Sequence, residues 1–405
     1  MAVEVRAAWP DEMDQFGLVG AYVYAGAFGD GPDNYVSQNN RAEWTLCAFV
    51  DGRMAASYAC VPYTMRANGK AVSLGGVTAV GTLPEYRRQG LLRAITTRSF
   101  ADMRERGQAV AALWASQAAI YQRYGYALAS ELVRYRIDTT EIGFADGDAG
   151  SARVVRMNAD AGYDVMKKIY IEFVADRIGY LHRSKVLWLN SVLSNGPATG
   201  PAHIAVAHAE GGAATGYVVY HVRNDKTGHP TRAQEIVVKD FVWLNGDAYR
   251  SLWSWLARHD LVGRVDWPRA PVDDPAQELF VEPRLLNKSS RDGIWLRVID
   301  AAQALAQRGY HTTGSITIDV AADDLTPWNA GRFTLACSPD GATVARSRAE
   351  PDLALSVKAL ASLYSGYRTP RQLAAWGLLH ADDAALDLAT RIFATRHAPH
   401  CPDHF

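Results

Sequence analysis

The sequence predicts an α/β protein with two domains of similar element order, followed by a third domain of different character. Three observations support this expectation. The first third alternates apolar strands with amphipathic helices, the middle repeats that order, and the last third joins strands to apolar-faced helices. A length of 405 residues suits two or three domains. We expect domains at 1–140, 141–292 and 293–405.

Several elements of the first third follow from local signals. A helix is expected from Asp11 to Phe28, with Asp11 as its N-cap after a proline. Residues 44–50 and 54–65 predict two strands joined at a turn formed by Asp51-Gly52. A second hairpin turn, Asn68-Gly69, leads into the next strand. This part therefore predicts an antiparallel meander.

The next elements continue the alternation. We expect a helix from Leu91 to Arg106, capped by Gly107. Residues 108–115 predict a buried strand, and 116–124 a short helix that ends before Gly125.

The stretch from Val77 to Arg93 organises this domain. Strand-forming residues are ended by Pro84, and Gly90 follows at a turn that opens an apolar helix. Backbone N–H groups at a helix N-terminus bind anions, and Arg87, Arg88 and Arg93 add positive charge. The pattern predicts a site for a pyrophosphate.

The order strand, proline, Arg-Arg-x-Gly and helix resembles the acetyl-CoA loop of GCN5-related N-acetyltransferases (GNAT). That family has Arg/Gln-x-x-Gly-x-Gly/Ala, and Leu92 stands where it often has a small residue. The segment 120–126 resembles the family's Tyr-x-x-x-Gly-Phe/Tyr motif. This resemblance implies that Tyr121 is the general acid, with Tyr124 and Tyr126 as alternatives.

The middle of the chain repeats the element order without the phosphate motif. Strands at 203–207 and 216–222, a strand at 233–244 and a helix at 247–259 match the first third. The Arg-Arg-x-Gly pattern is missing before that helix. The sequence favours a second fold of the same type that does not bind pyrophosphate, and an unrelated α/β segment is the alternative.

The last third has a different pattern. A strand at 293–300 precedes a helix at 301–308, strands at 314–320 and 331–336, and further helices to Ala394. A sheet flanked by helices with apolar faces resembles the sterol-carrier-protein type of domain.

Together these features resemble the Eis (enhanced intracellular survival) family of acetyltransferases. The domain order, the segments 295–300 and 361–366 and the terminal Phe405 carry the resemblance. It implies acetyl-CoA-dependent acetylation of amines, notably aminoglycosides, and often a homohexamer.

The resemblance also implies site residues. Acetyl-CoA contacts fall on Val80, Gly81, Thr82, Arg88, Gln89, Gly90, Leu91, Leu92, Arg93, Ser116 and Gln117. The family often has Ser-Glu where this chain has Ser116-Gln117. Tyr121 is implied as general acid, and the α-carboxylate of Phe405 as general base.

Thioester aminolysis needs a neutral amine, a stabilised oxyanion and a proton for the leaving thiolate. A cationic substrate also favours acidic and aromatic pocket walls. Asp30, Asp33, Trp44 and Trp114 are candidates for these walls, although each could be a loop cap or a core residue. The alternative function is a lipid or sterol carrier with a vestigial acetyltransferase domain.

Composition restricts the partners. A net charge of −1 does not favour nucleic acid or an anionic membrane as the main partner. The sequence has no leader-like start and no apolar run of membrane-spanning length, so we expect a cytoplasmic protein.

The cysteines and the histidines near the C-terminus are the remaining candidates for a metal site. Cys47, Cys60, Cys337 and Cys401 have no metal-ligand or redox spacing, and we expect free thiols. The terminal histidines, His397, His400 and His404, fit no closed tetrahedral set, so no metal is expected.

Overall fold

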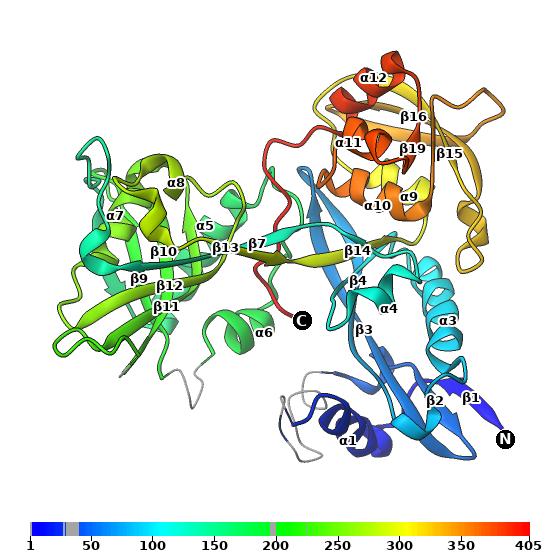
Figure 1. Cartoon of the computed structure of the whole chain (residues 1–405), viewed down its shortest axis with the longest axis horizontal. Helices are drawn as coiled ribbons and strands as arrows, with labels where there is room; N and C mark the ends of the chain where they lie inside the picture. Colours follow the sequence, from blue (N-terminus) through cyan, green and yellow to red (C-terminus); the bar gives the residue numbers. More distant parts are fainter. Residues whose placement is uncertain (1, 27–28, 30–39, 195–199, 225) are drawn as a thin grey trace. The chain divides into compact units, whose positions relative to one another are not determined.

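The computed structural model describes residues 2–26, 29, 40–194, 200–224 and 226–405 (Figure 1). The chain divides into two compact units. The first unit contains residues 1–129, 294–395 and 405, and the second contains 130–293 and 396–404. Among the described residues, no helix is both long and apolar enough to cross a bilayer.

The first unit contains a seven-stranded sheet in the order β1-β2-β3-β4-β5-β14-β6. Its strands are β1 Val3–Arg6, β2 Cys47–Val50, β3 Arg53–Ala67, β4 Lys70–Thr82, β5 Val110–Trp114, β6 Ala127–Leu128 and β14 Ile294–Val298. Its helices are α1 Met13–Val23, α3 Leu91–Glu105 and α4 Ala118–Gln122. The turns at Asp51-Gly52 and Asn68-Gly69 have positive φ at both residues, which confirms the two predicted hairpins.

The helix predicted to start at Asp11 begins later. Pro10–Glu12 forms a 3-10 turn, and Glu12 is the N-cap residue of α1. The Glu12 carboxylate accepts hydrogen bonds from the Arg6 guanidinium at 2.7 and 2.8 Å and from the Trp9 backbone N–H at 2.8 Å. The prediction for Asp11 was therefore wrong, because these contacts fix the turn first. The helix also ends earlier than predicted, at Val23, whereas the predicted end at Phe28 lies outside the described residues.

A second sheet of the first unit forms the C-terminal domain, in the order β17-β16-β15-β18-β19. Its strands are β15 Gly314–Val320, β16 Gly331–Ser338, β17 Gly341–Arg346, β18 Leu353–Leu355 and β19 Leu379–His380. Its helices are α9 Ala301–Gln307, α10 Val357–Ser365, α11 Pro370–Ala375 and α12 Asp383–Phe393.

Strand β14 differs from the expectation. Although predicted to open the C-terminal domain, it pairs with β5 from Ile294 opposite Trp114 to Val298 opposite Val110. Its apolar residue Trp295 joins the core of the N-terminal sheet, so burial there fixes the pairing.

The second unit contains a seven-stranded sheet in the order β13-β7-β12-β11-β10-β9-β8. Its strands are β7 Glu131–Asp138, β8 Arg153–Met157, β9 His203–His208, β10 Ala214–Arg223, β11 Gln234–Trp243, β12 Val262–Ala270 and β13 Ser289–Asp292. Its helices are α5 Ala159–Phe173, α6 Lys185–Leu187, α7 Gly246–Ala257 and α8 Ala276–Leu279. The order β9, β10, β11, α7 repeats the order β2, β3, β4, α3, as the sequence predicted, and β12 then follows α7 as β5 follows α3. The strand β7 belongs to this sheet, although the predicted boundary placed it in the first domain.

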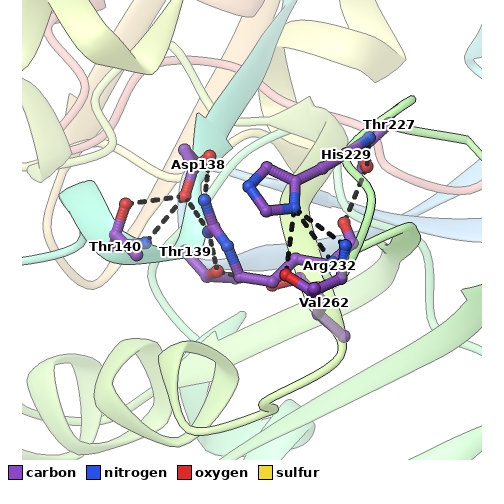
Figure 2. Close-up of polar contacts among 8 residues, drawn as sticks. Asp138, Thr139, Thr140, Thr227, His229, Arg232 and Val262 are labelled. Atoms are coloured by element: carbon purple, nitrogen blue, oxygen red, sulfur yellow. Dashed lines mark hydrogen bonds and ion pairs between the residues drawn. The ribbon is translucent and has the colours of Figure 1, made fainter.

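Polar contacts hold the segment before β11 against the end of β7, and Thr139 after β7 is in turn bonded to β12 (Figure 2). Arg232 donates to both carboxylate oxygens of Asp138, at 2.5 and 3.2 Å. The Nδ1 atom of His229 accepts the backbone N–H of Arg232 at 3.0 Å. Thr139 Oγ1 donates to the Val262 carbonyl at 2.6 Å. These contacts fix one end of the parallel pair β11–β12.

Candidate active site

The candidate site lies where two parallel strands separate. The register between β4 and β5 covers Leu74–Val77 and Val110–Leu113, whereas β4 stays paired with β3 through Thr82. The register with β3 shifts near Ala79, whose φ of 52° marks a bulge. Peptide groups of β4 beyond Val77 therefore face an opening rather than β5.

The two faces of β4 carry different groups. A Cβ on Gly75 would lie 2.9 Å from Met103 of α3, and Val77 belongs to the same core cluster as Tyr121. A Cβ on Gly76 would instead lie 3.1 Å from the Phe405 ring. Because neighbouring residues of a strand face opposite sides, Tyr121 and Phe405 lie on opposite faces of β4.

The bulge changes this alternation. Ala79 packs with the core beneath α1, while Val80 packs with the cluster that contains Tyr121. The opening beside β5 therefore has the Val80 side chain on the face of α3 and α4.

The loop from β4 to α3 exposes a helix N-terminus. Gly90 is the N-cap of α3 and has a φ of 81°, a conformation that favours glycine. A Cβ at this position would meet no atom within 4 Å. The glycine thus meets a backbone requirement and leaves free space before the first N–H groups of a 15-residue helix.

The side chains of this loop have distinct partners. Arg87 Nε donates to the Thr82 carbonyl at 3.1 Å, and Gln89 Nε2 donates to the Glu85 carbonyl at 3.1 Å. Arg93, in the first turn of α3, forms an ion pair with Asp324 at 3.4 Å. Because both side chains are exposed, this pair contributes little to stability. The loop therefore keeps positive charge beside the helix N-terminus.

These elements line one groove of about 740 Å³ in the first unit. It contains ten predicted cofactor residues and Tyr121: Val80, Gly81, Thr82, Arg88, Gly90, Leu91, Leu92, Arg93, Ser116, Gln117 and Tyr121. Gln89 and Phe405 lie outside the described lining. The groove is also lined by residues for which the sequence predicted no role: Val23, Tyr24, Tyr86, Ile120 and Arg123.

Tyr24 is the clearest of the missed residues. It follows α1, and its hydroxyl donates to the Val80 carbonyl at 3.0 Å. Burial raises the pKa of Tyr24, so the hydroxyl keeps its proton near neutral pH. No motif marks this position, because the contact joins residues 56 apart in the chain.

Tyr121 lies near the C-terminal end of α4, with 7% of its surface exposed. Burial raises the pKa of Tyr121 above its usual value near 10, and a hydrogen bond with Ser116 lowers it in part. Its alternative Tyr126 is 2% exposed in the core, with its ring 6.0 Å from that of Tyr121. Tyr124 is half-buried and lines the groove. The groove thus brings two of the three tyrosines to its surface.

The other predicted wall residues are not gathered here. Asp30 and Asp33 lie outside the described residues. Trp44 and Trp114 are partly buried, and neither belongs to the described lining. The Phe405 ring lies 5.1 Å from that of Tyr63, within the first unit.

The equivalent helix of the second unit cannot offer the same anion site. Two residues join β11 to α7, whereas eight join β4 to α3. The side chain of Asn245 accepts the Ala248 N–H at 2.9 Å, and Asp247 adds a negative charge to the first turn. A capped and acidic N-terminus repels a pyrophosphate, which supports the predicted loss of cofactor binding.

All four cysteines are free and buried. Among the described residues, no three His, Cys, Asp or Glu side chains group in a way that could hold a metal ion.

Comparison with known proteins places this geometry in a family. Residues 4–129 and 179–298 each match an acetyltransferase (GNAT) domain, and 301–402 match a sterol carrier protein domain. An uncharacterized N-acetyltransferase of Streptomyces coelicolor is 32% identical over 83% of this chain and 82% of its own length. The N-acetyltransferase Eis of Mycobacterium tuberculosis is 30% identical over 77% of this chain and 75% of its own.

A solved structure agrees along the whole chain. Eis1 from Mycobacterium abscessus is 29% identical, with a TM-score of 0.83 over the full length of both chains. The resemblance to acetyltransferases covers all three domains, so a carrier with a vestigial first domain is not favoured. The chain therefore belongs to the Eis family of GNAT N-acetyltransferases, with two GNAT domains in tandem and a sterol-carrier-like domain at the C-terminus.

Proposed function

We propose that the enzyme transfers the acetyl group of acetyl-CoA to a primary amine of a cationic small molecule such as an aminoglycoside, or to a lysine side chain. One observation carries the proposal. A single groove joins an uncapped helix N-terminus at Gly90 to a buried, protonated tyrosine at Tyr121. The first suits a pyrophosphate, and the second suits a leaving thiolate.

Acetyl-CoA would bind with its pyrophosphate at the N–H groups that follow Gly90, beside Arg88. The free space at Gly90 supports this fit. The pantetheine arm would follow the opening between β4 and β5, near Val80–Thr82 and Ser116-Gln117. An N–H group of the unpaired part of β4 would stabilise the oxyanion.

The transfer forms one C–N bond and breaks one C–S bond. The neutral amine attacks the thioester carbon, loses a proton through water to the α-carboxylate of Phe405, and becomes an amide. Tyr121 gives its proton to the departing sulfur, so CoA leaves as a thiol. The placement of Tyr121 and Phe405 on opposite faces of β4 supports separate paths for cofactor and amine.

An α-carboxyl has a usual pKa of about 3.3–3.7, which makes it a weak base. We infer that it holds the ammonium group and passes on its proton, rather than storing the proton. Partial removal from water would raise its basicity.

The test is thiol release from acetyl-CoA with a panel of aminoglycosides, polyamines and lysine peptides. A few glycines added after Phe405 should lower turnover by about 10²–10⁴-fold, while the same extension at the N-terminus should not. Full activity of the C-terminally extended enzyme would show that the base lies elsewhere.

The family resemblance also suggests a homohexamer, and the sequence suggests a cytoplasmic location. Buried free thiols suit a reducing compartment. Light scattering of the purified protein would give its oligomeric state.

A further inference from the structure

The second unit contains an opening between strands that resembles the one in the active site. The register between β11 and β12 covers Gln234–Val237, although β11 continues to Trp243. The register of β11 with β10 shifts beside Lys239, as the register of β4 shifts beside Ala79. The second GNAT fold therefore keeps the strand geometry that we propose binds the acyl group in the first.

This second opening is filled by the protein itself. Residues of β11 and β12 line it together with His400 and Pro402 of the C-terminal segment. The cavity that remains is about 10 Å³, the space of about one water molecule. Arg269 of β12 donates to the Pro402 carbonyl at 2.9 Å. The C-terminal segment thus fills the opening that corresponds to the proposed acyl site of the first fold.

A buried ion-pair network holds this segment. Arg183 Nε donates to both oxygens of Asp403, at 2.8 and 3.1 Å. The terminal nitrogens of Arg183 donate to Asp240 of β11 at 2.6 and 3.2 Å, and Tyr217 donates to Asp240 at 2.6 Å. The side chains of Arg183, Asp240 and Asp403 are each at most 4% exposed.

The backbone contacts are equally close. The His400 N–H donates to the Ile178 carbonyl at 3.0 Å. A Cβ on Gly179, which has a φ of 92°, would lie 2.6 Å from the His400 carbonyl oxygen. The His400 ring is 1% exposed and lies 5.3 Å from the Tyr180 ring. Both the backbone and the side chains of the segment are therefore fixed in the second unit.

Two residues, His404 and Phe405, follow Asp403 in the chain. Consecutive Cα atoms are 3.8 Å apart, so the Cα of Phe405 lies within about 7 Å of that of Asp403. We propose that the degenerate GNAT domain positions the terminal carboxylate, with Arg183, Asp240 and Asp403 as positioning residues for the proposed reaction. This inference rests on the proposed role of Phe405.

The test compares Asp403→Asn with Asp266→Asn. Asp266 is also buried and paired, with Arg134 at 2.7 and 2.5 Å, but its partner belongs to β7 rather than to the C-terminal segment. Asp403→Asn should lower turnover at least tenfold, leave the Kd for acetyl-CoA unchanged and increase amide hydrogen exchange at 400–405. Asp266→Asn should leave turnover and exchange at 400–405 near wild type.

A double variant separates positioning from a general loss of stability. If Asp403 acts through the terminal carboxylate, Asp403→Asn should cause no further loss of turnover in the enzyme extended after Phe405. Equal losses in the normal and extended enzymes would overturn the proposal. Normal turnover of Asp403→Asn together with raised exchange would also overturn it.

A different result would reject the hypothesis that Phe405 is the general base. Full activity of the extended enzyme would reject Phe405 as the base, while the exchange measurement would still report whether the network holds the segment. If Asp403→Asn does not fold, Arg269→Gln takes its place. This variant loses the donor to the Pro402 carbonyl and a buried positive charge near Asp403, and it should lower turnover about threefold and raise exchange at 400–405. Unchanged turnover and exchange in Arg269→Gln would then overturn the proposal.

Discussion

Tyr121 owes its proposed role to burial beside a groove. Burial raises its pKa, so the hydroxyl remains protonated throughout the neutral range. Tyr121→Phe removes only the hydroxyl and should lower turnover by about 10²-fold, with the Kd for acetyl-CoA near wild type. Steady-state kinetics and calorimetry measure the two effects. Tyr126→Phe, a core change in the same segment, is the control, and an unchanged turnover of Tyr121→Phe would move the role to Tyr124.

Asp274 is a second buried group whose protonation can be tested. Burial raises the pKa of Asp274 to about 7, and hydrogen bonds from the Ala276 N–H and the Tyr249 hydroxyl lower it in part. Its usual value is about 3.9, so between these values the folded state binds the proton more tightly than the unfolded state. The free energy of unfolding should therefore fall as pH rises from about 4 to about 7.

Asp274→Asn should remove this contribution, whose slope is at most about 1.4 kcal/mol per pH unit. Denaturant unfolding at pH 5, 6, 7 and 8 measures it. The difference in stability between variant and wild type should shift in favour of the variant as pH rises. A difference independent of pH would show that Asp274 keeps the same protonation in both states.

At the scale of elements, the loop between β4 and α3 combines a left-handed backbone at Gly90 with free space beside that residue. Gly90→Glu places a negative side chain where the pyrophosphate is proposed to bind and should weaken acetyl-CoA binding at least a hundredfold. Calorimetry measures this loss. Gly52→Glu is a matched control, because Gly52 has a φ of 82° and also no neighbour within 4 Å. Equal affinity of the two variants for acetyl-CoA would contradict the proposed pyrophosphate site at Gly90.

Elements specified by neighbouring residues were predicted well. The two-residue turns and the helix after Gly90 depend on local φ preferences and apolar periodicity, which the sequence displays directly. Strand β14 was assigned to the wrong domain, because its partner β5 lies far away in the chain and no local signal names it. Likewise, α1 started later because contacts of Glu12 with Arg6 fixed the preceding turn.

The candidate site likewise contains residues that the local sequence predicts and residues that only the tertiary structure brings together. The loop residues followed from a motif, whereas Tyr24 reaches Val80 through tertiary structure alone. The terminal phenylalanine was expected from family resemblance, but the network around Asp403 was not. Arg183 and Asp240 are ordinary charged residues in the sequence, and only the fold shows that they are buried together.

At the scale of the whole molecule, two GNAT folds share one chain but differ at both features that an acyl-CoA needs. The helix α7 begins with a capping Asn245 and an acidic Asp247, and its strand opening holds the C-terminal segment. The first fold has a free helix N-terminus and a groove of about 740 Å³, against about 10 Å³ in the second. These differences fit our proposals that the first fold binds acetyl-CoA and that the second holds the C-terminal segment.

This difference predicts that acetyl-CoA binds once per chain. Titration calorimetry should saturate at one cofactor per chain, and Gly90→Glu should abolish the whole signal rather than half of it. Asp247→Asn offers a stricter check, because neutralising the charge at α7 leaves the two-residue connection and the filled opening unchanged. That variant should still bind one cofactor. A stoichiometry of two in the wild type or in Asp247→Asn would mean that the second fold binds acetyl-CoA despite its short loop. The C-terminal segment would then have to leave its opening when the ligand enters.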